Sequence, residues 1–393
     1  MSSLSADRDL KSVASLPSSI DAEWVRRAYA GKLLPAQQRH LFSDVHWGFP
    51  TRTVRCSGVV QALPQAGTRL SDFPIQSRGV DYDLPDYLSR NCVVGLMVLQ
   101  HGRVVLESYE QGADATTPWI SMSLAKSVST TLVGAAIRDG CIGNVAEPLT
   151  RYLPELRNSA YASVSIRELL QMTSGVRWDD THTDPSSQRR RMLELQIEQQ
   201  PGTILRYLAS LPRAADPGSV WNYSTGETHV VGALVRAATG AWLADYLSEK
   251  IWSRAGMQSE ATWWLESPGG LEVAGSGISA TLRDYARFGS FLMQESVAGG
   301  EQVLPQGWVR EATSPRHIAG KRLDYGYMWW PVAAADGSFD DGAFSGRGIF
   351  GQFIYVNPRQ QVVIAVLSAR SKPKWAEAII DNDFFNSTVA ALR

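Results

Sequence analysis

The distribution of strand-like and helical patterns along the 393-residue chain constrains its fold more than any other feature. Residues 93–99 and 104–109 are β-rich runs on either side of a short polar turn, which predicts a hairpin. The pattern is then mostly helical from about residue 111 to 264. Strand-like runs, separated by Gly, Asn and Pro, return in the last third of the chain at residues 325–332, 343–349, 353–356 and 362–367.

Strand patterns near both ends with helices between them predict an α/β fold, in which both chain ends build one antiparallel sheet. We expect an α/β domain from residues 51–110 and 265–393, with residues 111–264 inserted as a mainly helical domain. Residues 1–50 are interpreted as an N-terminal extension whose function the sequence does not indicate. Helices are predicted at residues 21–32, 123–139, 165–172, 226–247 with a break at Gly240, 284–293, 305–312 and 375–392.

The charge balance argues against two classes of partner. The chain has 38 Lys and Arg against 39 Asp and Glu, a formal net charge of -1. Nucleic-acid binders and polybasic membrane-surface proteins need a surplus of cations, so neither partner is expected. No run of about 18 apolar residues predicts a membrane-spanning helix.

The N-terminus and the few cysteines favour a soluble, cytoplasmic protein. The cysteine and histidine pattern predicts no metal site, and no other cofactor is expected. Charged residues at positions 7, 8, 9 and 11 interrupt the apolar stretch that a secretory signal would need. Three scattered cysteines, Cys56, Cys92 and Cys141, are too few for a disulfide framework and fit a reducing compartment. The six histidines are dispersed and form no metal-binding motif.

Ser123-Leu124-Ala125-Lys126 begins the predicted helix over 123–139 and is the first candidate for chemistry. Residues three apart lie on one face of a helix, so the Lys126 amine can reach the Ser123 hydroxyl. An amine removes a serine proton only where burial or neighbouring cations lower its pKa. The helix N-terminus also favours an alkoxide and the oxyanion that follows. A capping serine with a solvated lysine is the ordinary alternative.

A second Ser-x-x-Lys gives an internal comparison. Ser371 and Lys374 have the same spacing, but a proline lies between them in a cationic linker, and we expect this copy to be inert. Lys126 instead lies in an otherwise apolar helix, where an unpaired ammonium is unfavourable. Tyr223, on a turn before the helix over 226–247, could relay a proton to a leaving group. Alone, such a tyrosine is more often a core anchor.

Six motifs occur in the order found in a known family, and together they cover roughly residues 90 to 390. The chain resembles the penicillin-recognising serine hydrolases, whose fold is β-lactamase/transpeptidase-like. The resemblance is strongest to the branch with class C β-lactamases, family VIII esterases, D-aminopeptidases and 6-aminohexanoate-dimer hydrolases. The matching motifs are Ser123-Leu124-Ala125-Lys126, residues 165–175, Tyr223-Ser224-Thr225, residues 275–281, residues 325–330 and residues 346–352.

The resemblance implies roles for four residues. Ser123 is then the acylated nucleophile and Lys126 its activating partner, while Tyr223 is a general acid or base. Which of Lys126 and Tyr223 takes the first proton stays open. The oxyanion hole would consist of the backbone N–H groups of Ser123 and Ile349.

Departures from the family pattern point away from antibiotics as substrates. Penicillin-recognising members usually have a Lys or His, a small residue and Gly where this chain has Arg347-Gly348-Ile349, and the Tyr motif ends in Thr225 rather than Asn. The 6-aminohexanoate-dimer hydrolases also lack that Lys and are cytoplasmic. They share Gly351-Gln352 and the paired Trp329-Trp330, which makes them the best match.

The sequence predicts a serine hydrolase that cleaves a small linear amide or carboxylic ester. A carboxylesterase or an acyltransferase on the same fold, and a non-catalytic ligand sensor, are the alternatives, and a homodimer is left open. Arg189, Arg190 and Arg191 are interpreted as a solvated helix face, with attraction of a carboxylate at the pocket rim as the alternative. The chain has 13 tryptophans, and rigid rings often line pockets. Candidate substrate-binding residues are Trp178, His182, Thr225 and Trp330.

Overall fold

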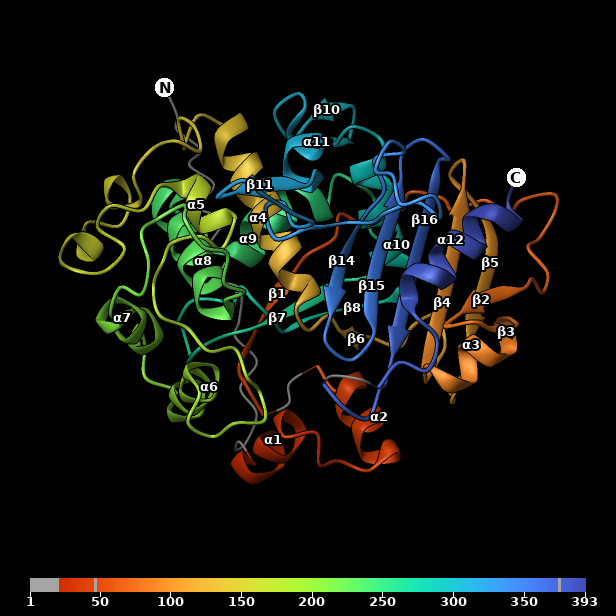
Figure 1. The fold of residues 1–393 in the computed structure, drawn as a ribbon, viewed down its shortest axis with the longest axis horizontal. Coiled ribbons are helices and arrows are strands. Elements are labelled where there is room, and N and C mark those ends of the chain that lie inside the picture. Colours follow the sequence, from red (N-terminus) through yellow and green to blue (C-terminus); the bar gives the residue numbers. More distant parts are fainter. Residues whose placement is uncertain (1–20, 46–47, 374–375) are drawn as a thin grey trace, which may run out of the picture.

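The computed structural model describes residues 21–45, 48–373 and 376–393, and its centre is a six-stranded antiparallel sheet (Figure 1). Segments far apart in the sequence meet in this sheet, because β16 pairs with β4 along most of its length, with Val363 opposite Leu99. The predicted sheet from both chain ends is therefore confirmed. Its strands, in spatial order, are β13 (Trp330–Pro331), β14 (Phe344–Gly348), β15 (Gln352–Asn357), β16 (Val362–Ser368), β4 (Val93–Gln100) and β5 (Arg103–Tyr109).

Helices cover both faces of this sheet because its central strands are apolar on both sides. α12 (Asp381–Ala391) lies in front of the sheet in Figure 1, where the Phe385 ring stacks on Tyr355 with centroids 4.7 Å apart. α10 (Leu282–Met293) packs on the opposite face. A Cβ at Gly289 of α10 would lie 2.6 Å from Val363, so glycine permits this close packing.

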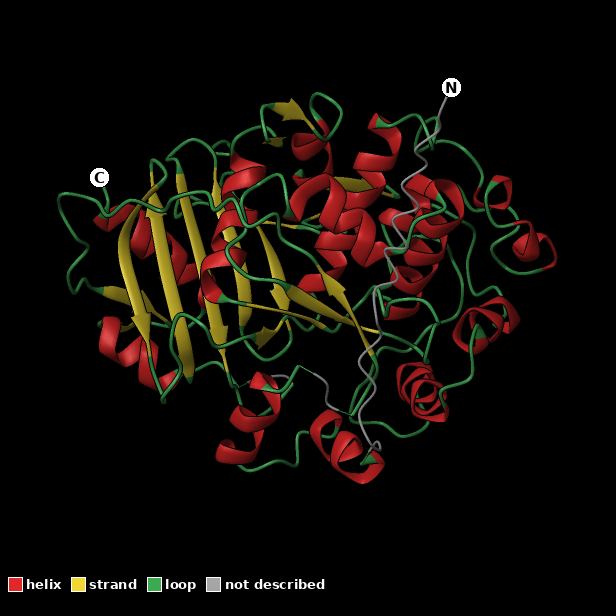
Figure 2. Ribbon diagram, turned by 180° about the vertical axis from the view of Figure 1, so that it is seen from behind, coloured by secondary structure: helices red, strands yellow, loops and turns green. Residues whose placement is uncertain are grey.

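A smaller four-stranded sheet links the central sheet to the helical part of the chain. Its strands are β1 (Thr51–Val54), β7 (Ala261–Trp264), β8 (Ile278–Ala280) and β6 (Trp119–Ile120). The helices of this helical part are visible at the right of Figure 2. They are α4 (Leu124–Arg138), α5 (Ile166–Leu170), α6 (Gln188–Glu198), α7 (Thr203–Ser210), α8 (Thr225–Thr239) and α9 (Leu243–Leu247).

Short elements complete the fold, and none of the described helices has the length and apolar character needed to cross a bilayer. The N-terminal helices are α1 (Ala22–Tyr29) and α2 (Pro35–Ser43). The other short elements are β2 (Ile75–Ser77), β3 (Val80–Tyr82), α3 (Leu84–Arg90), β9 (Val297–Ala298), β10 (Glu301–Gln302), α11 (Trp308–Thr313), β11 (Arg316–Ile318), β12 (Lys321–Leu323) and the helical turns Leu149–Arg151, Pro154–Asn158 and Ser248–Trp252.

Most predicted helices are confirmed, including the break at Gly240, whose φ of 72° ends α8. The strand predicted over 325–332 is wrong except for Trp330–Pro331. Met328 has a φ of 57°, and the N–H of Tyr327 donates to the carbonyl of Ala312 rather than to a neighbouring strand.

The helix predicted over 375–392 begins only at Asp381, and Trp375 lies outside the described residues. The N–H groups of Ala378 and Ile379 donate to the side chain of Asn91. That of Ile380 donates to Ser77. Side-chain acceptors from other segments thus replace the carbonyls that a helix would supply.

Candidate active site

Ser123 stands at the end of a short connection from β6 to α4. Ser121 fixes this connection, because its N–H donates to the carbonyl of Ile278 at 2.7 Å and its hydroxyl accepts from the N–H of Ile278 at 3.1 Å. Met122 then adopts a φ of 46°, a left-handed conformation that is uncommon for a non-glycine residue. This turn places Ser123 at the N-terminus of α4.

Lys126, one turn into α4, contacts Ser123 directly. Its Nζ donates to the Ser123 Oγ at 2.9 Å and to the carbonyl of Gly275 at 3.0 Å. The side chain is 2% exposed. Burial lowers the pKa of Lys126 to about 7, an effect that Arg189 reinforces and Asp180 opposes. The amine is therefore partly neutral near pH 7, which a general base requires.

Tyr223 completes the predicted triad from the turn before α8. It lines the same cavity as Ser123, whose side chain is close enough to lower the pKa of Tyr223 slightly. The Lys126 Nζ is 5.3 Å from the centroid of its ring. Burial raises the pKa of Tyr223 well above its usual range, so the phenol keeps its proton at neutral pH. The structure thus brings together the three residues that the sequence singled out.

The predicted oxyanion-hole residues also lie beside each other. Ser123 and Ile349 line the same cavities, and neither N–H donates to another residue of the described chain. Gly348 permits this arrangement, since a Cβ there would come within 2.6 Å of the Ser121 carbonyl. The N–H of Phe350 donates to the Gln352 side chain at 3.2 Å and holds the turn after Gly348.

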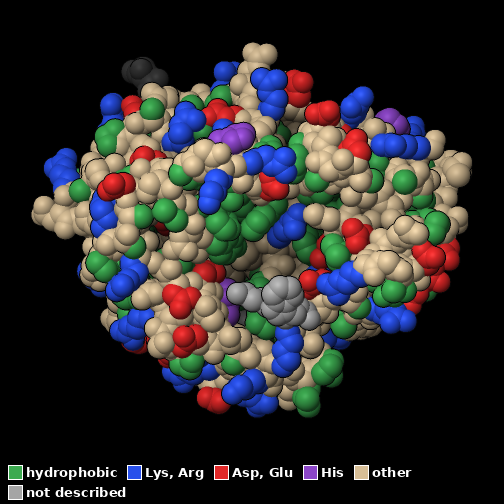
Figure 3. Space-filling model, in the orientation of Figure 1, with side chains coloured by type: hydrophobic (Ala, Val, Ile, Leu, Met, Phe, Trp, Pro, Cys, Tyr) green, Lys and Arg blue, Asp and Glu red, His purple; other side chains and the backbone are tan. Residues whose placement is uncertain are grey.

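Ser123 and Tyr223 line a cavity of about 560 Å³. Figure 3 shows a hollow with apolar side chains near the centre of the face of the molecule that is viewed in Figure 1. Trp178 and Trp330 line the cavity, as the sequence predicted for its walls. The Trp330 ring stacks on Tyr223, with centroids 6.2 Å apart and planes 29° apart. Their contact with substrate stays a prediction.

Thr225 and His182 occupy different positions relative to this cavity. Thr225 is buried and lines a small adjacent cavity with Ser123 and Lys126. His182 lines both cavities, and burial lowers its pKa to about 3, so the imidazole is neutral. Its ring stacks on Tyr29 with centroids 5.9 Å apart.

Three residues that the structure places here are not among the predicted site residues. Asp180 accepts from the indole N–H of Trp178 at 2.7 Å and from the N–H of Thr225 at 2.9 Å. Tyr29 and Arg189 line the small cavity with Lys126. No motif marks Tyr29, whereas the acidic loop that contains Asp180 was a visible signal.

The interpretation of Arg189, Arg190 and Arg191 as a solvated helix face is wrong for the first two. Arg189 is 3% exposed and Arg190 is 7% exposed, whereas Arg191 is exposed. α1 covers this side of α6: the Tyr29 hydroxyl accepts a hydrogen bond from Arg189 at 2.8 Å. Segments remote in sequence created this burial, so local charge patterning could not reveal it.

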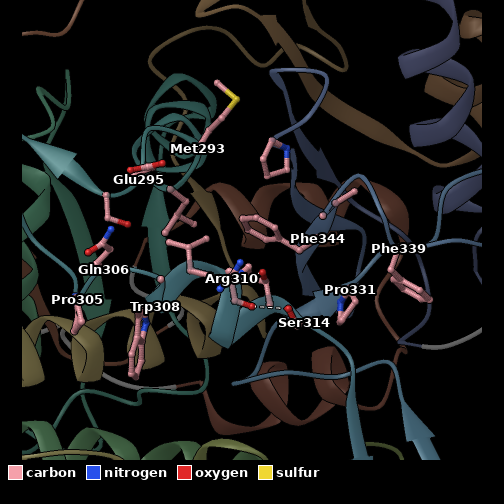
Figure 4. Close-up of a pocket in the computed structure, with 18 of the residues that line it drawn as sticks. Met293, Glu295, Pro305, Gln306, Trp308, Arg310, Ser314, Pro331, Phe339 and Phe344 are labelled. Carbon is pink, nitrogen blue, oxygen red and sulfur yellow. Dashed lines mark hydrogen bonds between the residues drawn. The ribbon is translucent and has the colours of Figure 1, made fainter.

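A separate cavity of about 630 Å³ lies beside α11 (Figure 4). Trp308, Arg310 and Phe344 line it, and it contains none of the predicted catalytic residues. The Ser123 cavity is therefore the candidate active site.

A model of the beta-lactamase family matches residues 92–382. The chain belongs to this family. The match spans both the Ser123 motif and the sheet, and the family's members are hydrolases. The protein is accordingly a hydrolase with the beta-lactamase fold, which confirms the fold and enzyme class predicted from the motifs.

The chain is also similar to individual proteins and solved structures within this family. The chain is 29% identical over 306 residues to the 6-aminohexanoate-dimer hydrolase of Paenarthrobacter ureafaciens, covering 74% of this chain and 76% of the relative. A solved structure from Bacillus anthracis, described as a candidate 6-aminohexanoate-dimer hydrolase, matches with a TM-score of 0.77 and 25% identity over 91% of this chain and 94% of that one. A class C beta-lactamase shares the fold, with a TM-score of 0.57 and 17% identity over 79% of this chain and 92% of that one.

Proposed function

We propose that the protein hydrolyses a small linear amide or carboxylic ester through an acyl-enzyme on Ser123, in the manner of a 6-aminohexanoate-dimer hydrolase. The observation that carries this proposal is the 2.9 Å contact between the Lys126 Nζ and the Ser123 Oγ at a buried lysine of lowered pKa. The apolar cavity of about 560 Å³ suits a small substrate.

In the first half-reaction, Lys126 acts as the base because its pKa lies near 7, whereas Tyr223 keeps its proton. The neutral amine takes the Ser123 proton as the oxygen attacks the carbonyl carbon. The carbonyl electron pair moves onto oxygen, where the N–H groups of Ser123 and Ile349 stabilise it. When the tetrahedral intermediate collapses, Tyr223 donates its proton to the leaving amine or alcohol, and the Lys126 ammonium returns a proton to Tyr223.

In the second half-reaction, water replaces the leaving group. Water gives a proton to the same Lys126 and Tyr223 pair as its oxygen attacks the acyl carbon. The intermediate then releases the carboxylic acid, and the proton returns to the Ser123 oxygen. No other reactant is needed, and the enzyme is restored.

A substrate panel with matched serine variants tests the proposal. Rates are measured on an aminohexanoate dimer, p-nitrophenyl butyrate, a D-amino-acid amide and nitrocefin. We expect turnover of the linear amide or the ester, loss of that turnover in Ser123→Ala, and retention in Ser371→Ala, which alters the other Ser-x-x-Lys. Equal turnover by Ser123→Ala and the wild type would refute the assignment.

A further inference from the structure

The N-terminal helix α1 forms part of the wall around the proposed catalytic residues. Ala28 and Tyr29 line the small cavity that also contains Ser123 and Lys126. α1 lies next to α6 in Figures 1 and 2, and an ion pair joins the two helices. The Arg26 Nε and Nη2 donate to the Glu194 carboxylate at 3.0 and 2.6 Å.

Tyr29 contacts the Arg189 guanidinium where α1 packs against α6. Its hydroxyl accepts from the Arg189 Nη2 at 2.8 Å, and the guanidinium carbon lies 4.7 Å from the centroid of its ring. Among the described residues, the His182 ring also contacts the Tyr29 ring and stacks on it at an interplanar angle of 14°. Tyr29 therefore fixes the Arg189 guanidinium through both its ring and its hydroxyl.

Arg189 is a buried charge without a carboxylate partner. It is 3% exposed, no described acid lies within salt-bridge distance, and its buried Nε has no hydrogen-bond acceptor among the described residues. Burying an unpaired cation destabilises a fold, and apolar side chains of similar size often serve better. Stability alone thus gives no reason for an arginine here.

Two formal charges, from different segments, act on the Lys126 amine. The Asp180 carboxylate, on the loop after Trp178, raises the pKa of Lys126, whereas the Arg189 guanidinium, on α6, lowers it. The Lys126 amine also contacts the Ser123 hydroxyl, the Gly275 carbonyl and the face of the Tyr223 ring, and the buried Thr225 hydroxyl belongs to the same cavity wall. Two further titratable side chains stand in the same wall: the neutral imidazole of His182 and the phenol of Tyr29.

We propose that Tyr29 and Arg189 are positioning residues of this site: Tyr29 holds the Arg189 guanidinium in the cavity wall that it shares with Lys126, where its positive charge opposes the negative charge of Asp180. The N-terminal segment, which carries no recognisable catalytic motif, thereby adds to the effect of burial on the pKa of the base. This inference rests on the proposed function, in which Lys126 takes the Ser123 proton.

The test is the pH profile of kcat/KM for p-nitrophenyl butyrate. Arg189→Met leaves Asp180 unopposed, so the acid limb is expected to move to higher pH by about one pH unit. Asp180→Asn keeps an oxygen acceptor for Trp178 and Thr225 but removes the charge, and it is expected to move the limb to lower pH.

Control variants separate charge from folding. Arg191→Met removes an exposed cation that pairs with Glu198 on the same helix, and it should leave the limb in place. Arg189→Lys keeps the charge and should shift the limb by less than about 0.3 pH unit. Tyr29→Phe keeps the ring and removes the hydroxyl, and it should shift the limb in the Arg189→Met direction. It also serves as the test if neither Arg189 variant folds.

An acid limb that stays in place in folded Arg189→Met, or a shift of equal size in Arg191→Met, would overturn the positioning role while leaving the proposed function intact. The proposed function itself fails separately, if Ser123→Ala retains turnover.

Discussion

Replacing Lys126 by Met is expected to stabilise the protein while abolishing turnover. The fold lowers the pKa of this lysine from 10.5 to about 7, chiefly by burial. The folded state thus disfavours the ammonium form. Below pH 7 this lowers the free energy of unfolding by about 5 kcal/mol relative to a lysine whose pKa is the same in the folded and unfolded states. Between pH 7 and 10.5 the unfolded chain binds the extra proton, so the wild-type free energy of unfolding rises with pH across that window.

The variant removes this dependence and also leaves the Gly275 carbonyl without its 3.0 Å donor. That loss offsets about 1 to 3 kcal/mol of the gain. The net stabilisation at pH 6 is then about 2 to 4 kcal/mol, and linkage between pKa values of about 7 and 10.5 reduces it by about 2 to 3 kcal/mol by pH 9.

Urea unfolding of wild type and Lys126→Met, followed by tryptophan fluorescence at pH 6 and pH 9, measures both quantities. Lys321→Met, at an exposed lysine of β12, is the matched control and should show no difference between the two pH values beyond about 0.5 kcal/mol. The reasoning is refuted if the stability difference between Lys126→Met and wild type is the same at both pH values, because the lysine pKa would then be equal in the folded and unfolded states.

Three further substitutions have defined outcomes. Tyr223→Phe should lower kcat for an amide about 10²- to 10⁴-fold through loss of proton transfer, as steady-state rates will show, while the acyl-enzyme still forms with an activated ester. Gly348→Ala places a Cβ 2.6 Å from the Ser121 carbonyl and should reduce kcat/KM at least tenfold without loss of helix content by circular dichroism. Burial raises the pKa of Glu227 to about 8, so the folded state binds the extra proton between pH 4.5 and 8 and loses stability as pH rises through that window. Glu227→Gln, which can keep the hydrogen bond with Ser174, should stabilise more at pH 8 than at pH 5 in urea unfolding.

The parts of the fold that local pattern determines could be predicted from the sequence. The buried helix α4, the hairpin β4–β5 and the Gly-ended α8 follow from apolar spacing and turn residues, and the structure has all three. The failures lie where tertiary contacts replace local ones. Residues 378–380 donate hydrogen bonds to Asn91 and Ser77 instead of forming a helical turn.

The candidate site divides in the same way. Ser123 and Lys126 are linked by helical spacing, so their contact was readable, and the ordered motifs of the family added Tyr223 and Ile349. Tyr29 lies far from Arg189 in sequence and reaches it only through the packing of α1 on α6. Such a contact depends on how helices dock, which residue spacing does not encode.

Covalent capture of the acyl-enzyme tests the central claim most directly. The protein is mixed with p-nitrophenyl butyrate, quenched in acid, digested and analysed by mass spectrometry. We predict one butyryl group on the peptide that contains Ser123, formed in the wild type and absent from Ser123→Ala. A butyryl group on another residue, or turnover of the ester with no adduct on Ser123 at any quench time, would contradict the account.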